Sequence, residues 1–323
     1  MPFNRVTNNS LSHSVIDSLM RNKSTLALLQ EQISSGTKVS KPSDDALAAI
    51  GILSINTNIG KSENYLANID TVEPELTVSE NSVKSTIDYI TRAKELIVSA
   101  ANGVNGVDQI SAINNEIKQI LEGVTGVANT QYNGKYIFAG TNTGTVPFDL
   151  DEANNNQIIY NGTPETENYE RKAEIADNVT VAMNLPGDSV FGTYEQISAG
   201  PPAVMGGKDG IIKTLSELKK MMNDMVTAGS VDHDSLRGKL GNLDKDLNTV
   251  LEAQTKIGGI ASRVTMTKNK LEDDQISLAS YKSKLGDIDL AKSISDLNFQ
   301  QNSLEASLKV GAQVIQRSLL DYI

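Results

Sequence analysis

Residues 236–285, LRGKLGNLDKDLNTVLEAQTKIGGIASRVTMTKNKLEDDQISLASYKSKL, decide the fold because every seventh residue in them is aliphatic. The series is Leu236, Leu243, Val250, Ile257, Val264, Leu271, Leu278 and Leu285. Such a repeat forms one apolar stripe along a helix that packs against other helices. The positions four residues after each member of the series are apolar at Leu240 and Leu247 but polar or small further along the chain. This is typical of a helix that also contacts water. The stretch predicts one helix roughly 75 Å long at 1.5 Å per residue.

Apolar residues at steps of three and four predict further helices beside this one. The most regular series is Ile110, Ile113, Ile117, Ile120, Val124 and Val127, and others run over residues 83–97 and 211–225. We expect a helical rod made of residues 43–140 and 206–285. Its expected core contains Ile113, Ile117, Ile120, Leu243, Ile257 and Leu271. We expect the first of these series to pack on the helix of residues 236–285.

The rod's first helix carries its own start and stop signals. Ser43 is the expected N-cap, with Asp44 and Asp45 placing negative charge near the helix N-terminus. Ala46, Leu47 and Ile50 are expected to form its first buried turn. Pro74 lies inside the same helical pattern, so a kink or break is expected just before it.

The two ends of the chain carry matching apolar stripes. The N-terminal stripe consists of Leu11, Val15, Leu19, Leu26, Leu29 and Ile33, and the C-terminal one of Leu290, Ile294, Leu297, Leu304, Leu308, Ile315 and Leu319. The heptad phase of the long helix would place Lys292 in its stripe, so the register changes near Gly286 and Asp287. We therefore predict a terminal coiled-coil domain made of residues 1–42 and 286–323.

Residues 141–205 differ from the rest because heptads are absent and Gly, Pro, Asn and Thr accumulate. Residues 157–160 and 178–183 have the pattern of strands. The segment contains ten Asp and Glu residues but only two basic residues, Arg171 and Lys172, so it carries −8 of the chain's net charge of −11. The sequence predicts a mainly α fold, a bundle of long helices with a terminal coiled-coil hairpin and a helical rod, with a small acidic β domain inserted and facing outward.

Composition excludes several function classes. The chain has 323 residues, with 29 Lys and Arg against 40 Asp and Glu. This acidic balance argues against nucleic acid and against anionic membranes as partners, because both need clustered basic residues. Cysteine is absent, and no apolar run is long enough to span a membrane. The first residues lack the apolar core of a cleavable secretory signal.

The sequence offers no strong catalytic, cofactor-binding or metal-binding pattern, so an enzyme is not expected. Residues 149–154 open like a calcium loop, but the sixth position lacks Gly and the twelfth is Tyr160. A solvated acidic loop is the preferred interpretation. His13 and His233 are far apart in sequence and are expected on helix faces or in a loop, without a ligand role.

The terminal stripes favour association. Two helices of this length bury only one stripe against each other, which leaves apolar side faces. A monomeric bundle with adhesive ends is one interpretation. The other is that residues 1 to about 40 and from about 286 onward become ordered only on polymerisation, through the terminal stripes.

Four segments resemble known sequence blocks. LQEQISSG at 29–36 with KPSDDA at 41–46, RAKELIVSAANG at 92–103, and LKVGAQVIQRSLLDYI at 308–323 resemble the three blocks of the bacterial flagellin superfamily. ANTQYNGKYIFAGT at 128–141, followed by Pro147 and Phe148, resembles the hook–filament junction branch of that superfamily more than filament flagellin. The resemblance covers both helical halves and implies a flagellin-like bundle of long helices. The acidic segment matches the superfamily only in its position in the chain and in its β type.

The resemblance implies a structural adaptor that polymerises between the hook and the filament of the bacterial flagellum. It implies as partners the chain itself in a ring, a hook-associated protein on the hook side, flagellin on the filament side, and an export chaperone on the C-terminal helix. It also implies export through the flagellar type III apparatus to an extracellular position. The alternatives are a minor flagellin, which would form long filaments alone, and a cytosolic coiled-coil scaffold.

Overall fold

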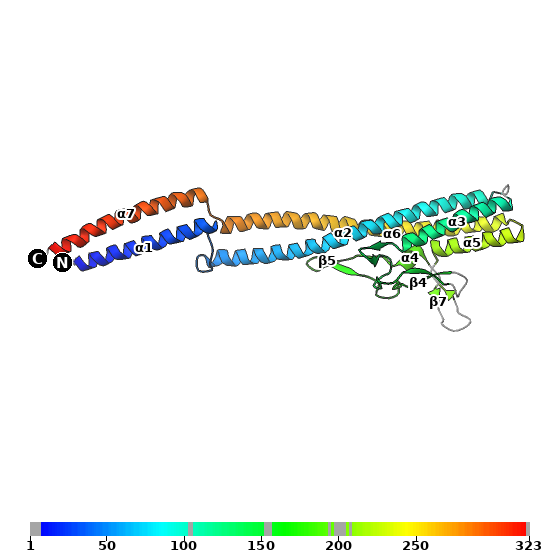
Figure 1. The fold of residues 1–323 in the computed structure, drawn as a ribbon, viewed down its shortest axis with the longest axis horizontal. Helices are drawn as coiled ribbons and strands as arrows, with labels where there is room; N and C mark the ends of the chain where they lie inside the picture. Colours follow the sequence, from blue (N-terminus) through cyan, green and yellow to red (C-terminus); the bar gives the residue numbers. More distant parts are fainter. Residues whose placement is uncertain are drawn as a thin grey trace. The chain divides into compact units, whose positions relative to one another are not determined.

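The structure is a computed structural model that describes residues 8–102, 106–151, 157–192, 195–196, 205–206 and 209–320. Side chains are described within these ranges except at 8–12, 150–151, 157, 195–196, 205–206 and 313–320. The helices are α1 (Asn8–Ser35), α2 (Ala46–Ala100), α3 (Val107–Ala128), α4 (Gly187–Phe191), α5 (Ile211–Ala228), α6 (His233–Gly286) and α7 (Leu290–Leu320) (Figure 1). The mainly helical fold predicted from the heptads is confirmed.

Within the described residues, the strands form four antiparallel pairs. These are β1 (Gln131–Tyr132) with β2 (Lys135–Tyr136), β3 (Phe148–Asp151) with β4 (Gln157–Tyr160), β5 (Lys172–Ala176) with β6 (Val179–Ala182), and β7 (Glu195–Gln196) with β8 (Met205–Gly206). The two strands expected from the sequence correspond to β4 and β6. By backbone contacts the chain divides into two compact units, residues 1–61 with 272–323 (unit 1) and residues 62–271 (unit 2).

Unit 2 contains the main hydrophobic core. The heptad residues of α6 that fall in this unit, from Leu236 to Leu271, are all buried. α3 contacts α5 directly, and Ile117 and Ile120 of α3 lie in the same buried cluster as Leu243 and Ile257 of α6. α3 therefore shares a buried cluster with α6, while its direct packing on α6 stays a prediction. The helix that it contacts directly is α5, which the stripe did not identify.

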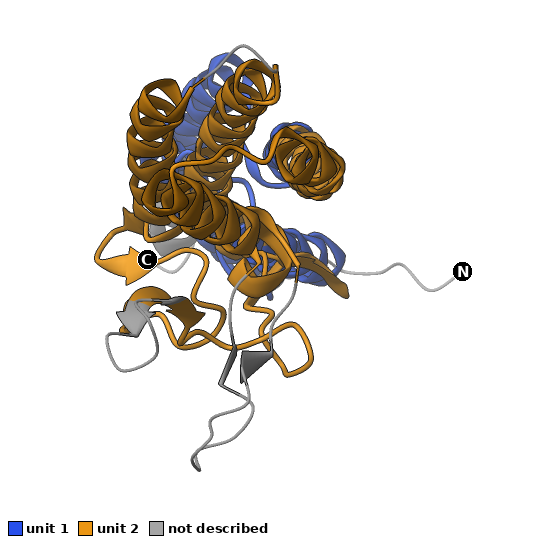
Figure 2. Cartoon of the chain, turned by 90° about the vertical axis from the view of Figure 1, so that its right-hand side faces the viewer, with its two compact units in different colours: residues 1–61, 272–323 blue, residues 62–271 orange. Residues whose placement is uncertain are grey.

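The strands lie along one side of the helices of unit 2 (Figures 1 and 2). The apolar side chains of this region join the helical core: Phe148 of β3, Phe138 just after β2 and Phe191 of α4 belong to the cluster of α3 and α5. The rings of Phe138 and Phe191 are 4.9 Å apart. The reason is that a two-stranded pair has too few residues to bury both faces by itself. The segment expected as a separate β domain is thus built onto the helical core, and the three-part division of the chain stays a prediction.

The β5–β6 pair is attached to α2. Ile175 and Val181 of the pair lie in a second buried cluster with Ile69, Val72, Leu76, Val264 and Leu271 of α2 and α6. Beside this cluster the guanidinium of Arg171 forms an ion pair with the largely buried carboxylate of Glu75. Breaking such a buried pair on one side would leave a buried charge, so this contact fixes where the hairpin lies on α2.

At α2 one local expectation was wrong and a second was wrong in part. The helix begins at Ala46, and its N-cap is Asp45, whose Oδ1 accepts the N–H of Ala48 at 3.0 Å, rather than Ser43. Pro74 lies inside one continuous helix of 55 residues, so a break is absent, while the kink expected as the other outcome stays a prediction. A proline removes one backbone hydrogen bond. Ile69, Val72 and Leu76 are buried on either side of it, and this packing holds the helix together.

Unit 1 contains two helix pairs. α1 and α7 lie side by side and run antiparallel, because Asn22 contacts Ser307 and Thr37 pairs with Asp287. The first turns of α2 lie against the last turns of α6, where Gly51 faces Leu285 and Gly286 faces Ile52. The register change expected near Gly286 is the end of α6, since α7 begins at Leu290.

Candidate assembly surface

In the described part of the chain, no group of three or more His, Asp or Glu side chains could hold a metal ion. The ring Nδ1 of His233 lies 3.0 Å from the carbonyl oxygen of Ala100, while His13 is exposed. The calcium-loop candidate at 149–154 lies partly outside the described residues. No helix that the structure describes is long and apolar enough to cross a membrane.

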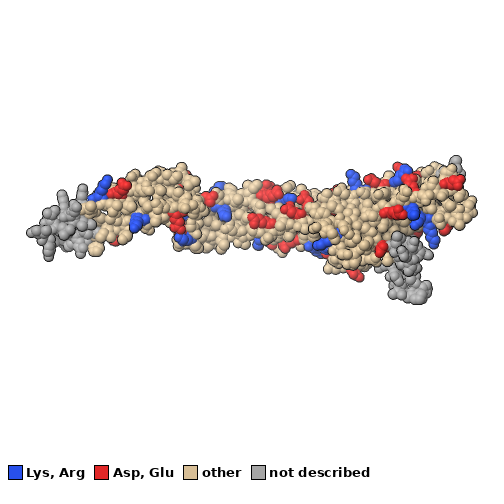
Figure 3. Space-filling model, viewed as in Figure 1, with Lys and Arg blue, Asp and Glu red and all other residues tan. Residues whose placement is uncertain are grey.

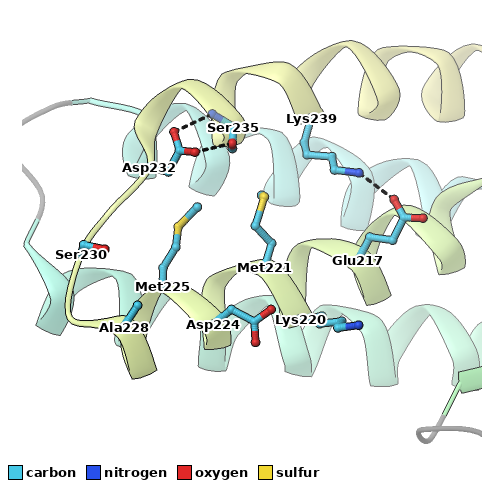
Figure 4. Close-up of a pocket in the computed structure, with 10 residues that line it drawn as sticks. All are labelled: Glu217, Lys220, Met221, Asp224, Met225, Ala228, Ser230, Asp232, Ser235 and Lys239. Carbon is cyan, nitrogen blue, oxygen red and sulfur yellow. Dashed lines mark hydrogen bonds and ion pairs between the residues drawn. The ribbon is translucent and has the colours of Figure 1, made fainter.

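A groove of about 510 Å³ lies between the end of α5 and the start of α6, with the sulfur-containing side chains of Met221 and Met225 in it (Figure 4). Lys239 pairs with Glu217 at 2.6 Å. Asp232 accepts the hydroxyl of Ser235 at 2.5 Å and its N–H at 3.1 Å, and these bonds lower the pKa of the Asp232 carboxyl. The Ser235 hydroxyl therefore donates to the carboxylate that caps α6, and the lowered pKa makes this carboxylate a weak base.

Asp246 of α6 is a buried carboxyl, only 4% exposed, and one of its oxygens has no hydrogen-bond partner within the described residues. Burial raises its pKa from the ordinary 3.8 to about 6, against a hydrogen bond from Thr214 that lowers it. The group lies in the packed interface of α5 and α6, away from any site where a substrate could reach it. Its consequences concern stability.

The interface of α1 and α7 matches the predicted stripes in part. Val15, Leu19, Leu26, Leu29 and Ile33 of α1 are half-buried, as are Leu297 and Leu304 of α7. Polar groups interrupt this interface: Gln300 donates to the carbonyl oxygen and side-chain oxygen of Asn22 at 3.3 and 3.2 Å, and Asn22 donates to Ser307 at 3.3 Å. Such a polar layer fixes the register of paired helices.

The remaining predicted end residues face solvent or lie outside the described side chains. Leu290, Ile294 and Leu308 are about half exposed. The side chains of Leu11, Ile315 and Leu319 are outside the described set. In the rod, Ile117, Ile120, Leu243, Ile257 and Leu271 are buried, and Ile113 is half-buried. The role of the end residues in self-association stays a prediction.

Unit 1 exposes most of the large apolar side chains that are at the surface. Among described side chains, thirteen of the seventeen exposed large apolar ones belong to this unit. They are Ile16, Met20, Leu28, Leu47, Ile50, Leu53, Ile276, Tyr281, Leu290, Ile294, Phe299, Leu308 and Val310. Of the unit's described apolar side chains only Ile55 is buried. A helix pair with this distribution is typical of a surface that another protein covers.

The start of α2 is the part of this surface that the sequence interpretation missed. Leu47 and Ile50 were expected in a buried turn, yet they are 84% and 66% exposed, and Leu53 continues the same face. The opposite face, with Gly51 and Ile52, takes the contact with α6 instead. The sequence signal for this exposed face was the spacing of residues 47, 50 and 53, which form one stripe on the helix. Residues 48, 52 and 55 form a second, separate stripe.

Charge gives this surface little selectivity of its own. On the face drawn in Figure 3, basic and acidic side chains of the described residues are interspersed, and much of the remaining surface is uncharged. The ion pair of Lys41 with Glu31 in unit 1 is largely solvent-exposed. Such pairs contribute little to binding or stability, so apolar contact is the main interaction that the surface offers.

Two family descriptions match the chain. The bacterial flagellin N-terminal helical region matches residues 6–143, and the bacterial flagellin C-terminal helical region matches residues 240–323, together more than two thirds of the chain. The chain belongs to the bacterial flagellin family. It is accordingly a structural component of the bacterial flagellum.

Relatives within the flagellin family include both junction and filament proteins. Flagellar hook-associated protein 3 of Escherichia coli is 24% identical over 284 residues, which cover 86% of this chain and 87% of that protein. The flagellin of Bacillus subtilis is 22% identical over 319 residues, or 97% of each chain. The solved flagellar hook-associated protein 3 of Legionella pneumophila has the same fold, with a TM-score of 0.60 at 16% identity over 72% of this chain and 98% of that one.

Proposed function

We propose that this flagellin-family chain is a junction subunit, which polymerises with itself in a ring and joins the hook to the filament. The distribution of apolar side chains in unit 1 carries this proposal: Ile55 is buried, while thirteen large apolar side chains of the described set are exposed. Copies of the chain arranged around an axis would bury these faces against one another. The likeness to hook-associated protein 3 over 87% of its length supports the junction, and the resemblance of residues 128–148 to the junction branch favours it over the filament.

A filament subunit is the second candidate. The likeness to the Bacillus subtilis flagellin over 97% of both chains favours it. The two functions predict different products: a junction subunit stops at a short ring, whereas a flagellin forms long filaments from purified protein alone. A cytosolic coiled-coil scaffold, the third alternative raised by the heptads, is disfavoured by membership of the flagellin family.

The proposed junction role brings specific partners. One end of the ring would contact a hook-associated protein on the hook side, and the other would contact flagellin. Before assembly, a cytoplasmic export chaperone would cover the apolar face of α7, where Leu290, Ile294 and Leu308 are exposed. Export through the flagellar type III apparatus would then place the chain outside the cell.

Serine substitutions on the two units test the proposal. In a strain that lacks the chain's own gene, a variant with Leu47→Ser, Ile50→Ser and Leu53→Ser should be made and exported but should leave hooks without filaments, because an exposed apolar face of unit 1 is lost. The matched control carries Val98→Ser, Leu251→Ser and Met266→Ser, which change exposed apolar side chains of unit 2. It should restore filaments.

Electron microscopy of hooks and filaments gives the result. Full restoration by the unit 1 variant, or loss in the control variant alone, would contradict the proposal that unit 1 carries the assembly contacts. Long filaments from the purified, unsubstituted chain would favour the flagellin alternative.

A further inference from the structure

The two linkers of unit 1 are bonded to each other. Residues 36–45 connect α1 to α2, and residues 287–289 connect α6 to α7. The N–H of Lys38 donates to the carbonyl oxygen of Gly286 at 2.5 Å, and the N–H of Ile288 donates to the carbonyl oxygen of Gly36 at 3.2 Å. Thr37 and Asp287 are thereby paired as an antiparallel bridge. Two segments about 250 residues apart in sequence thus cross as a minimal two-stranded pair.

Each linker is also bonded to the helix that precedes it. Gly36, at a φ of +72°, is in the left-handed region where a helix commonly ends, and its N–H donates to the carbonyl oxygen of Gln32 at 2.9 Å. The side-chain amide of Gln32 donates to the carbonyl oxygen of Lys38 at 3.0 Å. On the other linker, Ser283 donates its hydroxyl to Asp287 at 2.6 Å. Both linkers therefore have a fixed path.

We propose that these linkers form one clasp, residues 36–38 with 286–288, which makes the α1/α7 hairpin a single body on the ends of α2 and α6. Without the clasp, α1 and α7 would each be joined by a separate flexible linker. With the clasp, a displacement of α1 also displaces α7, so the apolar faces of the two helices keep the same relative orientation. We propose further that the clasp stays closed when the chain assembles. This last step rests on the proposed function; the clasp in the free chain does not.

A pair of cysteines tests the clasp directly, because the natural chain contains no cysteine. The two backbone hydrogen bonds between the linkers lie on either side of Thr37 and Asp287, which are therefore a non-hydrogen-bonded antiparallel pair. The Cα atoms of such a pair are about 4.5 Å apart. That spacing is within the range a disulfide accepts. Thr37→Cys with Asp287→Cys should form an intramolecular disulfide on mild oxidation of the folded, purified chain. The two single variants control for the substitutions themselves.

The same double variant tests whether the clasp opens during assembly. The oxidised and reduced forms should restore filaments on hooks to the same extent. A folded chain that forms no intramolecular disulfide would overturn the clasp. A disulfide that blocks assembly until it is reduced would overturn the proposal that the clasp stays closed during assembly. If the chain fails as a junction subunit, disulfide formation in the free chain still decides the clasp by itself.

Hydrogen exchange provides a measurement that needs no cross-link. Lys38→Pro removes the N–H that binds Gly286, and exchange at the N–H of Ile288, on the other linker, should rise at least tenfold if the two linkers open together. Lys38→Ala is the matched control, because it changes the side chain and keeps the N–H. Exchange at Ile288 that is the same in both variants would mean that the linkers move independently.

Discussion

Asp246 places an ionisable group in the core between α5 and α6, and its effect on stability follows from its pKa. Burial raises that pKa to about 6, from an ordinary value of 3.8, so between these pH values the folded chain binds a proton that the unfolded chain does not. The free energy of unfolding should therefore rise as the pH falls from about 6 to about 4. The gain is on the order of 2–3 kcal/mol for a shift of this size.

Asp246→Asn should abolish this dependence, because the amide has no charge to neutralise. Denaturant unfolding of the full chain at several pH values between 4 and 7 measures it. Glu252→Gln, on the exposed side of the same helix, is the control and should keep the slope of the unsubstituted chain. A slope that persists in Asp246→Asn would show that another group is responsible.

At the scale of the element, α3 illustrates how burial decides the cost of a substitution. Ile117 is fully buried, whereas Ile113, one turn earlier on the same apolar stripe, is only half-buried. Ile117→Ala should cost about 2–5 kcal/mol of unfolding free energy, since the lost methylene groups leave a cavity among α3, α5 and α6. Ile113→Ala should cost about half as much or less, because water can fill the space left. Equal costs, measured by thermal or denaturant unfolding, would mean that the stripe is buried by a contact outside the described chain.

The same scale shows which elements the sequence could predict. The seven-residue repeat from Leu236 and the stripe from Ile110 predict α6 and α3, because long periodic patterns outweigh local exceptions. Local signals did less well. Ser43 and Asp45 are both good N-caps, and only the backbone path decides between them. Pro74 has the same sequence signature in a broken helix as in a continuous one, since the difference lies in the packing of Ile69 and Leu76.

The candidate site was harder to predict than the fold because it depends on which apolar side chains lack a partner. The stripes at Val15–Ile33 and at Leu290 onward were visible as apolar, but the sequence cannot say which members meet across α1 and α7. Leu47 and Ile50 look like core residues in the sequence because their neighbours, Ile52 and Ile55, are equally apolar. The contacts of Gly51 with Leu285 and of Ile52 with Gly286 show which face of α2 is covered within the chain.

At the scale of the whole molecule, stability is unevenly distributed between the two units. Forty buried apolar residues lie in the described core, and all but Ile55 are in unit 2. Ordering a helix costs about 1–2 kcal/mol of backbone entropy per residue, which helices in water recover mainly through tertiary burial. α1 has 28 residues and α7 has 31, and their shared interface is only half-buried and includes the polar layer around Asn22. Away from the linker pair at Thr37 and Asp287, α1 and α7 in a free chain therefore have little to hold them folded.

We expect α1 and α7 to exchange their amide hydrogens rapidly in the isolated chain, and to become protected in the polymer, where neighbouring copies can cover Ile294, Phe299 and Leu308. Protection in the isolated chain should fall along both helices with distance from the linker pair at Thr37 and Asp287. Hydrogen exchange followed by mass spectrometry, on the chain alone and on assembled material, measures this, with α3 and α5 as internal references that should stay protected in both. If α1 and α7 in the isolated chain are as protected as α3, the hairpin is stable without neighbours, and the exposed apolar faces of unit 1 must be explained by a contact other than one that folds it.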